Sequence, residues 1–310
     1  MYCAAGAEPS PPAARAPDPV HLTVLSSGSG GNSILIRADD TRVLVDAGLT
    51  ARAMTERLVL AGVPHRSIQH ILVTHAHLDH ARSSGILAKR HQALLHCPEA
   101  MMRNKSAARS PRLAALRPGV PVLLPGPGAN SEARVGDTQS HTAPDTLAPS
   151  TSAPRASGAP APLTATAVPI PHDCDPTVAY AFDHGGRRAV ILTDMGEPRP
   201  ALARRLAGAH VLVLEFNHDE RMLAEGPYPP LLKRRVAGVG GHLSNTQAAN
   251  MLRYLAGPQL HTLVLAHLSE KNNSPDLALA AARQTLAEMG LDGVRVLAAE
   301  QHEVGPNLRV

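Results

Sequence analysis

HAHLDH, at residues 75–80, is the most informative stretch of this chain, and it directly follows the apolar run ILVT at 71–74. The apolar run predicts a short buried strand, so four potential metal ligands leave one rigid element together. A turn there can direct the two leading histidines toward one metal ion and Asp79 and His80 toward a second. Imidazole and carboxylate ligands suit zinc, and also manganese or iron where oxygen ligands increase. The alternative, a polar loop that is merely rich in histidine, would leave these groups at an apolar strand end without a cation to satisfy them.

Three further residues follow apolar runs in the same way. We predict strands that end just before each of them: Thr164–Ile170 before His172, Ala189–Thr193 before Asp194, and Thr262–Ala266 before His267. Taken singly, each could be an ordinary loop residue. Their shared position at strand ends predicts that they complete a site with two metal ions.

His242 lies just before a predicted helix, Asn245–Leu255, whose start has the capping-box spacing of Ser244 and Gln247. It is therefore next to free N–H groups and the positive end of a helix dipole, which suits a phosphate oxygen. We expect His242 to bind the scissile phosphate or to protonate the leaving oxygen; the alternative is a local hydrogen bond at the helix start. Other candidate contacts to phosphates lie at this and a neighbouring helix start: Ser244, Ser269, Asn272 and Asn273.

This pattern resembles the metallo-β-lactamase superfamily, whose five motifs match Asp46, HAHLDH, His172, Asp194 and His267. Flanking stretches resemble its YycJ/WalJ-type branch, relatives of the ribonuclease J nucleases that lack the β-CASP domain. These stretches are SGSGGNS (27–33), IPHDCDPTVAY (170–180), LEFNHD (214–219), GGHLSN (240–245) and AHLSEKNN (266–273). The resemblance covers residues 21 to 310 apart from a Pro/Ala-rich insertion.

The resemblance also implies a role for each motif residue. One metal ion would be held by His75, His77 and His172, the other by Asp79, His80 and His267, with Asp194 as the bridge. Asp46 would orient a ligand histidine or the cluster turn, with a buried capping carboxylate as the alternative. Asn217, His218 and Asp219 belong to a family segment, and they either support the ligands or form a solvent-exposed turn.

The family implies a 5′ to 3′ exonuclease that acts on double-stranded DNA and uses two divalent ions, zinc or manganese. Two such ions about 3.5–4 Å apart can share a hydroxide nucleophile and clamp a phosphodiester. We expect Asp79 and His242 to be the catalytic residues. One alternative is a metallohydrolase of a small ester, lactone or thioester, which His242 beside a capped helix disfavours. Another is an inactive, metal-binding regulatory protein, which the complete ligand set argues against.

Composition limits how a nucleic acid could be held. The 310 residues include four Tyr, two Phe and no Trp, so the core must be aliphatic and stacking on bases is not the main binding mode. The net charge of +4 is compatible with an anionic partner gripped through its phosphates, with little sequence preference. The glycine-rich turn at 26–33 is followed by a strand and not a helix, so we expect no nucleotide cofactor.

The fold expected is α/β, a four-layer αββα sandwich in which two sheets lie between outer helices. Three strands in succession begin the chain, near 21–26, 34–36 and 42–46, as an antiparallel start. Further strands are predicted at 93–97, 122–124, 177–182, 211–215 and 294–298, and further helices at 51–61, 200–207 and 275–289. Residues 1–20 read as a disordered tail, 21–310 as one domain, and 138–162 as a disordered Pro/Ala-rich insertion.

The cysteines at 3, 97 and 174 form no CxxC pair and cannot all be paired, which excludes a disulfide framework and favours a reducing compartment. No apolar run approaches the ~18 residues that span a bilayer, and the first 20 residues have no apolar segment typical of a signal peptide. We therefore expect a cytoplasmic protein without a membrane partner.

Overall fold

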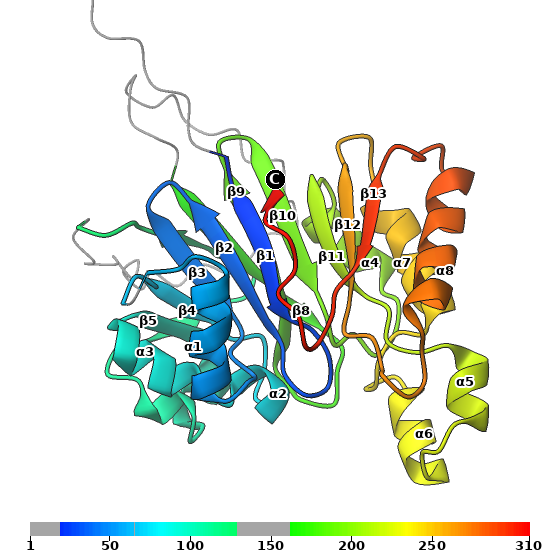
Figure 1. Ribbon diagram of the computed structural model, residues 1–310, viewed down its shortest axis with the longest axis horizontal. Helices are drawn as coiled ribbons and strands as arrows, with labels where there is room; N and C mark the ends of the chain where they lie inside the picture. The colour runs from blue at the N-terminus through cyan, green and yellow to red at the C-terminus, as the bar shows by residue number, and fades with distance from the viewer. Residues whose placement is uncertain (1–18, 65, 129–161) are drawn as a thin grey trace, which may run out of the picture.

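The computed structural model of the protein describes residues 19–64, 66–128 and 162–310. The predicted tail therefore lies outside the described residues except for its last two positions, and the predicted insertion lies outside them except for Pro162. Within these ranges, two seven-stranded sheets pack face to face and helices cover both outer faces (Figure 1). The αββα fold predicted from the sequence is confirmed.

The first sheet has the order β14-β1-β2-β3-β4-β5-β6. Its strands are β1 (His21–Ser26), β2 (Ser33–Ala38), β3 (Thr41–Val45), β4 (His70–Leu72), β5 (Leu94–Pro98), β6 (Leu113–Leu116) and β14 (Leu308–Arg309). The second sheet has the order β13-β12-β11-β10-β9-β8-β7. Its strands are β7 (Pro121–Leu124), β8 (Leu163–Ile170), β9 (Thr177–His184), β10 (Arg187–Leu192), β11 (Val211–Glu215), β12 (Thr262–Ala266) and β13 (Arg295–Ala298).

The helices form the two outer layers. They are α1 (Ala51–Leu60), α2 (Leu78–Ala81), α3 (Ser84–His91), α4 (Pro200–Leu206), α5 (Glu220–Glu225), α6 (Pro230–Val236), α7 (Asn245–Leu255) and α8 (Pro275–Glu288), with two 3₁₀ turns, η1 (Glu99–Arg103) and η2 (Ala107–Arg109). Thr50 caps α1, because its hydroxyl accepts a hydrogen bond from the backbone N–H of Ala53 at 3.3 Å. The turn expected within HAHLDH contains the one-turn helix α2, and α3, α5 and α6 were not predicted. Among the described residues, no helix has the length and apolar character needed to cross a membrane.

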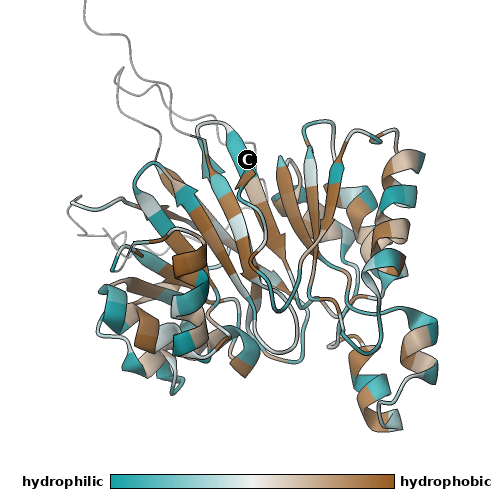
Figure 2. Cartoon of the chain, viewed as in Figure 1, coloured by the Kyte–Doolittle hydropathy of each residue, from teal (hydrophilic) through white to brown (hydrophobic). Residues whose placement is uncertain are grey.

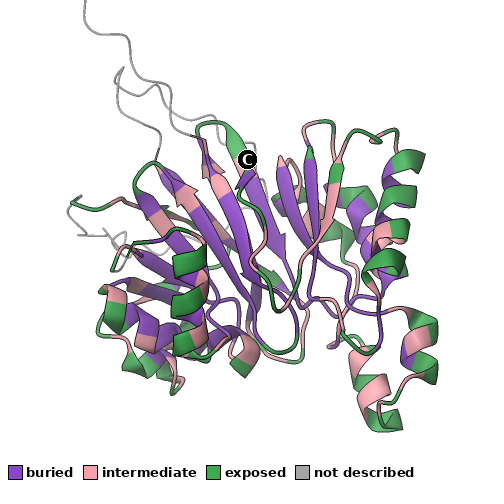
Figure 3. Cartoon of the chain, in the orientation of Figure 1, coloured by how far each residue is buried: buried purple, intermediate pink, exposed green. Residues whose placement is uncertain are grey.

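Side chains along the buried strands point alternately toward the opposite sheet and toward the outer helices, so a strand contributes to two hydrophobic cores. Val211 and Val213 of β11 face the other sheet, whereas Leu212 and Leu214 face the helices. This period of two is the expected geometry of a strand buried on both sides. Figures 2 and 3 show the result: the strands are hydrophobic and buried, and hydrophilic, exposed positions lie on the outer sides of the helices.

Each sheet has an antiparallel part and a parallel part. Strands β1 to β3 are antiparallel, as predicted, and β3 to β6 are parallel. In the second sheet, β7 to β10 are antiparallel and β10 to β13 are parallel. Because the carboxyl ends of parallel strands meet at one edge, the loops after β4, β10, β11 and β12 are available to build a common site.

Two hydrogen bonds tie the sheets together at that edge. The hydroxyl of Tyr180, on β9, donates to the backbone oxygen of Val73 at 2.7 Å. The backbone N–H of Val178 donates to the oxygen of Thr74 at 3.1 Å. Val73 and Thr74 lead directly from β4 into HAHLDH, so the second sheet fixes the stretch that carries the cluster.

We predict that Tyr180→Phe lowers the free energy of unfolding by about 1–3 kcal/mol, because the buried oxygen of Val73 loses its donor. Tyr180 is fully buried, so no water can replace its hydroxyl without rearrangement. Equilibrium denaturation measures the change. Tyr254→Phe is the matched control, since Tyr254 is 52% exposed. A loss below about 0.5 kcal/mol for Tyr180→Phe would contradict the role of this bond.

Candidate metal centre

The seven predicted ligands come together at the edge where the strands of both sheets end. His75 follows β4, His77 is the N-cap of α2, and Asp79 and His80 lie in α2. The second sheet contributes the other three ligands: His172 after β8, Asp194 after β10 and His267 after β12. Each sheet thus provides part of the cluster, and neither could form it alone.

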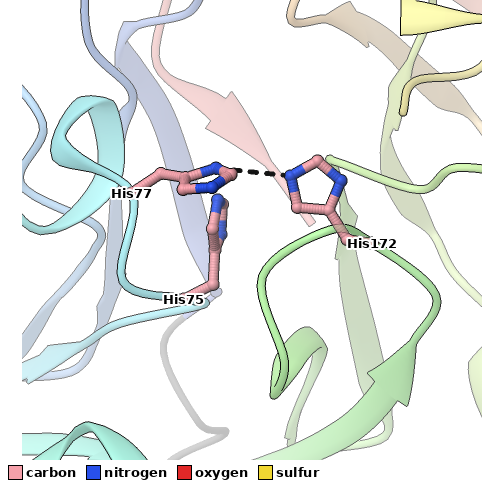
Figure 4. Close-up of side chains that lie close together, drawn as sticks. All are labelled: His75, His77 and His172. Carbon is pink, nitrogen blue, oxygen red and sulfur yellow. Dashed lines mark hydrogen bonds between the residues drawn. The ribbon is translucent and has the colours of Figure 1, made fainter. Parts of the chain in front are cut away.

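Three histidines form one group, shown in Figure 4. The rings of His75 and His77 lie 4.7 Å apart between centroids, and each lies 5.1 Å from the ring of His172. The Nε2 atom of His172 is 3.4 Å from Nδ1 of His77. Each ring offers a nitrogen within 4.8 Å of the others, so the three can converge on one ion.

Asp79, His80 and His267 form a second group of the same kind. Asp79 Oδ2 lies 3.5 Å from His80 Nε2 and 3.6 Å from His267 Nε2. Asp194 lies between the groups: its Oδ2 is 3.2 Å from His80 Nε2, and it also forms a compact set with His75 and His80. This is the position that a bridging carboxylate requires.

Several buried atoms of the two groups lack hydrogen-bond partners. Among the described residues these include His75 Nε2, Asp194 Oδ2 and His267 Nε2. An unsatisfied buried polar atom costs about 1–3 kcal/mol. Three of them at the centre of one cluster fit a pair of divalent cations, since coordination would satisfy all three.

The outer nitrogens of the histidines are held by fixed partners. Each Nδ1 has a neighbour: Thr74 Oγ1 for His75 at 3.0 Å, Asp46 Oδ2 for His80 at 2.7 Å, the oxygen of Gly241 for His172 at 3.0 Å, and Glu215 Oε1 for His267 at 3.1 Å. Such contacts fix the orientation of a ligand ring and leave Nε2 for the metal ion. His77 differs, because its Nδ1 faces the ring of His172.

Asp46 lies where a residue that orients a ligand is expected. Its Oδ1 accepts a hydrogen bond from the N–H of Thr74 at 2.8 Å, and its Oδ2 accepts one from the Thr74 hydroxyl at 2.9 Å as well as contacting His80. Asp46, Asp194 and His267 all have positive φ angles, 62°, 61° and 56°. Non-glycine residues rarely adopt this conformation, and such strain is concentrated at functional sites.

The pKa values divide the histidines into two kinds. Burial lowers the pKa of His75 well below its usual value, and burial also lowers the pKa of His77. Burial opposes charge on His80 too, but the carboxylates of Asp194 and Asp46 outweigh it and raise its pKa well above the usual value. For His267, burial is outweighed by Asp194, Asp79 and Glu215, which raise the pKa to about 10. A metal ion must therefore displace protons from the second group.

Glu215 is a site residue that sequence reasoning missed. It is fully buried at the end of β11, where its Oε1 contacts Nδ1 of His242 at 2.8 Å and Nδ1 of His267 at 3.1 Å. Its Oε2 accepts hydrogen bonds from the N–H groups of Met195 and Leu243. Burial would raise the pKa of Glu215, but the neighbouring His242 and His267 lower it to about 2. A signal was present, because a charged residue ends an apolar strand here, much as the predicted ligand Asp194 follows β10.

Asn217 and His218 are buried, at 7% and 2% exposure, so the alternative of a solvent-exposed turn is wrong. Asn217 Nδ2 donates to the backbone oxygen of His267 at 2.9 Å, which holds a predicted ligand. The backbone oxygen of His218 accepts a hydrogen bond from the N–H of Asn245, and within the described residues its Nδ1 has no hydrogen-bond partner. Asp219 caps α5 by accepting a hydrogen bond from the N–H of Met222.

The predicted phosphate contacts Ser244, Asn272 and Asn273 are at most 6% exposed. Ser244 completes the capping box of α7 and donates to Glu220 at 2.6 Å. Asn273 exchanges hydrogen bonds with Asn245, and Asn272 donates to Ser269. These groups join loops inside the protein, so a phosphate could reach them only if those bonds broke. Capping spacing located the helix correctly but carried no information about exposure.

Two further neighbours of the cluster were not predicted. Asp173 Oδ1 lies 3.5 Å from His77 Nε2 and 3.4 Å from His172 Nε2, and Arg235 donates to Asp173 Oδ2 at 2.6 Å. Asn32, from the glycine-rich turn, places its side-chain amide 2.9 Å from His80 Nε2. Both residues lie in stretches that carry the family resemblance, which gave the only sequence signal for them.

Comparisons with known proteins show what this chain is similar to. Residues 41–268 match the family described as the beta-lactamase superfamily domain. The chain is 29% identical to the exodeoxyribonuclease YycJ of Bacillus anthracis, over 93% of this chain and 97% of that protein. It is 27% identical to the exodeoxyribonuclease WalJ of Streptococcus pneumoniae, over 83% of this chain and 84% of that protein. Among solved structures, the metallo-beta-lactamase fold protein YhfI of Bacillus subtilis has a TM-score of 0.64 at 16% identity, covering 94% of this chain and all of that one.

We predict that Asp46→Asn weakens metal binding about 10- to 100-fold, because the carboxylate that orients His80 is lost. Competition with a chromophoric chelator measures the affinity for zinc. Asp40→Asn is the control, because it removes one negative charge, as Asp46→Asn does, at an exposed position. Equal affinities for the Asp46 variant and the wild type would show that this carboxylate does not support the site.

Metal uptake by the metal-free protein should release protons at pH 7. The pKa of His267, about 10, keeps its ring protonated there, and a coordinating nitrogen must be deprotonated. Competition by protons weakens as pH rises, so the apparent metal affinity should increase from pH 6 to pH 9. Calorimetric titration with zinc, in two buffers of different ionisation enthalpy, counts the protons. Release of none at pH 7, with a pH-independent affinity, would contradict the protonated state of His267.

Proposed function

The chain belongs to the metallo-β-lactamase superfamily and is a distant relative of the YycJ and WalJ exodeoxyribonucleases, and from this we propose that it is a dinuclear metal-dependent phosphodiesterase that degrades duplex DNA from 5′ to 3′. The observation that carries the proposal is the pair of His242 and Glu215 beside the metal cluster. A metal site alone would serve many hydrolytic reactions. A histidine held at a helix start next to it favours phosphate chemistry.

The chain offers ligands for two divalent ions, of which zinc and manganese fit the donors. His75, His77 and His172 would hold one ion and Asp79, His80 and His267 the other, with Asp194 between them. Such ions, when bound, supply Lewis-acid stabilisation of a phosphodiester and lower the pKa of a bound water.

His242 is placed to act on the phosphate. Its ring lies 5.2 Å from that of His172 and 5.0 Å from that of His267, so it borders both groups. Glu215 holds Nδ1 at 2.8 Å, which leaves Nε2 for the substrate. The side chain of His242 is 22% exposed, whereas those of His80 and His267 are at most 3% exposed, so a substrate can reach it.

These contacts give His242 the features of a general acid. A carboxylate on Nδ1 fixes the ring, so that Nε2 faces the substrate and can donate a proton to the leaving oxygen. Asp79 is the complementary group, because its carboxylate is partly exposed and faces both His80 and His267. It can accept the proton of an attacking water.

Cysteine usage supports the cytoplasm as the place of action. Cys97 and Cys174 are free thiols, and Cys97 is buried in the outer core beneath α1 and α3. Free thiols persist in reducing compartments such as the cytoplasm.

We predict that the purified protein, with Mn²⁺ or Zn²⁺, releases nucleotides from the 5′ ends of an end-labelled DNA duplex. Asp79→Ala should abolish this activity. His242→Ala should lower kcat about 10²- to 10⁴-fold, the usual contribution of a general acid. The metal content of the His242 variant should not change, because neither proposed set of ligands includes His242.

His302→Ala is the control, since the side chain of His302 is 76% exposed and touches Glu270. Release from labelled 5′ ends, measured with and without chelator, shows whether hydrolysis needs a metal ion, and its loss in Asp79→Ala purified in the same way excludes a contaminating nuclease. Hydrolysis of a lactone or thioester, with no release from any nucleic acid, would overturn the proposed function. An unchanged kcat for His242→Ala would remove its assigned role.

A further inference from the structure

Positive charge is concentrated in one segment of the chain. From residue 82 to residue 117 there is one acidic residue, Glu99, and there are eight basic residues: Arg82, Lys89, Arg90, Arg103, Lys105, Arg109, Arg112 and Arg117. The segment therefore carries +7, whereas the whole chain carries +4, so the rest of the chain is net negative. A single-sign region of this size marks a surface for an anionic partner.

Part of this charge lines a surface hollow of about 690 Å³. Its lining residues are Arg66, Ile86, Lys89, Arg90, Gln92 and Arg109, four cations without a carboxylate. Within the described part of the chain, no carboxylate pairs with Arg66, Lys89 or Arg109. Arg90 is partly engaged, since its Nη1 lies 3.4 Å from the oxygen of Ala51 in α1.

The fold brings these cations together from three separate segments. Lys89 and Arg90 lie in the last turn of α3, Arg66 in the loop before β4, and Arg109 in η2. Gly85 in α3 permits the approach of η2, because a Cβ there would lie 2.0 Å from the backbone oxygen of Ser106. The helix dipole favours basic residues in a last turn, which accounts for Lys89 and Arg90 only. Arg66 and Arg109 add like charges that repel them, a cost that a bound anion would offset.

The hollow is connected to the metal centre by α3. This helix begins just after α2, which carries Asp79 and His80, and its eight residues advance about 12 Å. Phosphates of one DNA strand follow each other every ~3.4 Å, so α3 spans roughly three or four of them. Arg82 is exposed between the two helices and could contact the intervening backbone.

We propose that this basic hollow is a second DNA-binding site, which holds the sugar–phosphate backbone of the duplex while its end lies at the metal centre. The inference rests on the proposed function. Guanidinium groups match phosphate geometry, and four of the six lining residues are Arg or Lys. Residues 82–117 contain no Phe, Tyr or Trp, so the main aromatic platforms for bases are missing and we expect little dependence on DNA sequence.

The test removes three of the four charges, in the triple variant Arg66→Ala/Lys89→Ala/Arg109→Ala. Its affinity for a 20-base-pair duplex with phosphorothioate linkages, measured by fluorescence anisotropy, should fall about tenfold or more. The slope of log affinity against log salt should decrease by about three, since each lost phosphate contact contributes ~0.9. Metal content and melting temperature should stay at wild-type values, because these side chains are exposed.

The matched control is Arg204→Ala/Arg205→Ala/Arg283→Ala, which removes three exposed arginines from the other helical layer. Wild-type affinity for DNA in the Arg66/Lys89/Arg109 triple variant would overturn the proposal. An equal loss of affinity in the control variant would also overturn it. Displacement of the duplex by millimolar phosphate, or tighter binding of duplex RNA of the same sequence, would overturn the assignment to duplex DNA. Binding by the wild type without hydrolysis of the unmodified duplex would overturn the proposed function alone and leave this surface in place.

Discussion

The main constraint on this structure is a group of buried side-chain atoms that lack hydrogen-bond partners. His75 Nε2, Asp194 Oδ2 and His267 Nε2 meet where the two sheets join, and each would be unfavourable there alone. The surrounding structure prevents them from relaxing. Tyr180 holds the stretch before the cluster, and Asp46 holds the ring of His80. Asp46, Asp194 and His267 keep positive φ angles. Coordination of two cations is the arrangement that satisfies these atoms together.

Much of this could be predicted from the sequence, because the ligands obey one rule: each follows an apolar strand. His172, Asp194 and His267 were found in this way, and the long helix α7 was located by its capping box. Glu215 was missed because it is the last residue of its strand and so was taken as part of it. The short helix α3 was missed because Gly85 weakens its helical pattern. The predicted phosphate contacts Ser244, Asn272 and Asn273 are buried, and the spacing of residues in a sequence does not show which side chains are buried.

The histidine side chains of the site differ in their exposure to solvent. The rings of His80 and His267 are almost inaccessible, whereas His242 borders solvent and is held by a buried carboxylate. Exposure alone does not separate the predicted ligands from His242, since the side chains of His77 and Asp79 are 34% and 25% exposed. The basic hollow beside α3 would, as proposed, add affinity for a long polyanion and none for a small ester. A long, negatively charged substrate would account for this hollow, which the metal cluster does not explain.

Anomalous diffraction from crystals grown with Mn²⁺ tests the dinuclear site most directly. We expect two peaks about 3.5–4 Å apart, one among His75, His77 and His172 and the other among Asp79, His80 and His267, with Asp194 touching both. Ordered side chains at this edge without a peak, or with a single ion bound elsewhere, would contradict the account.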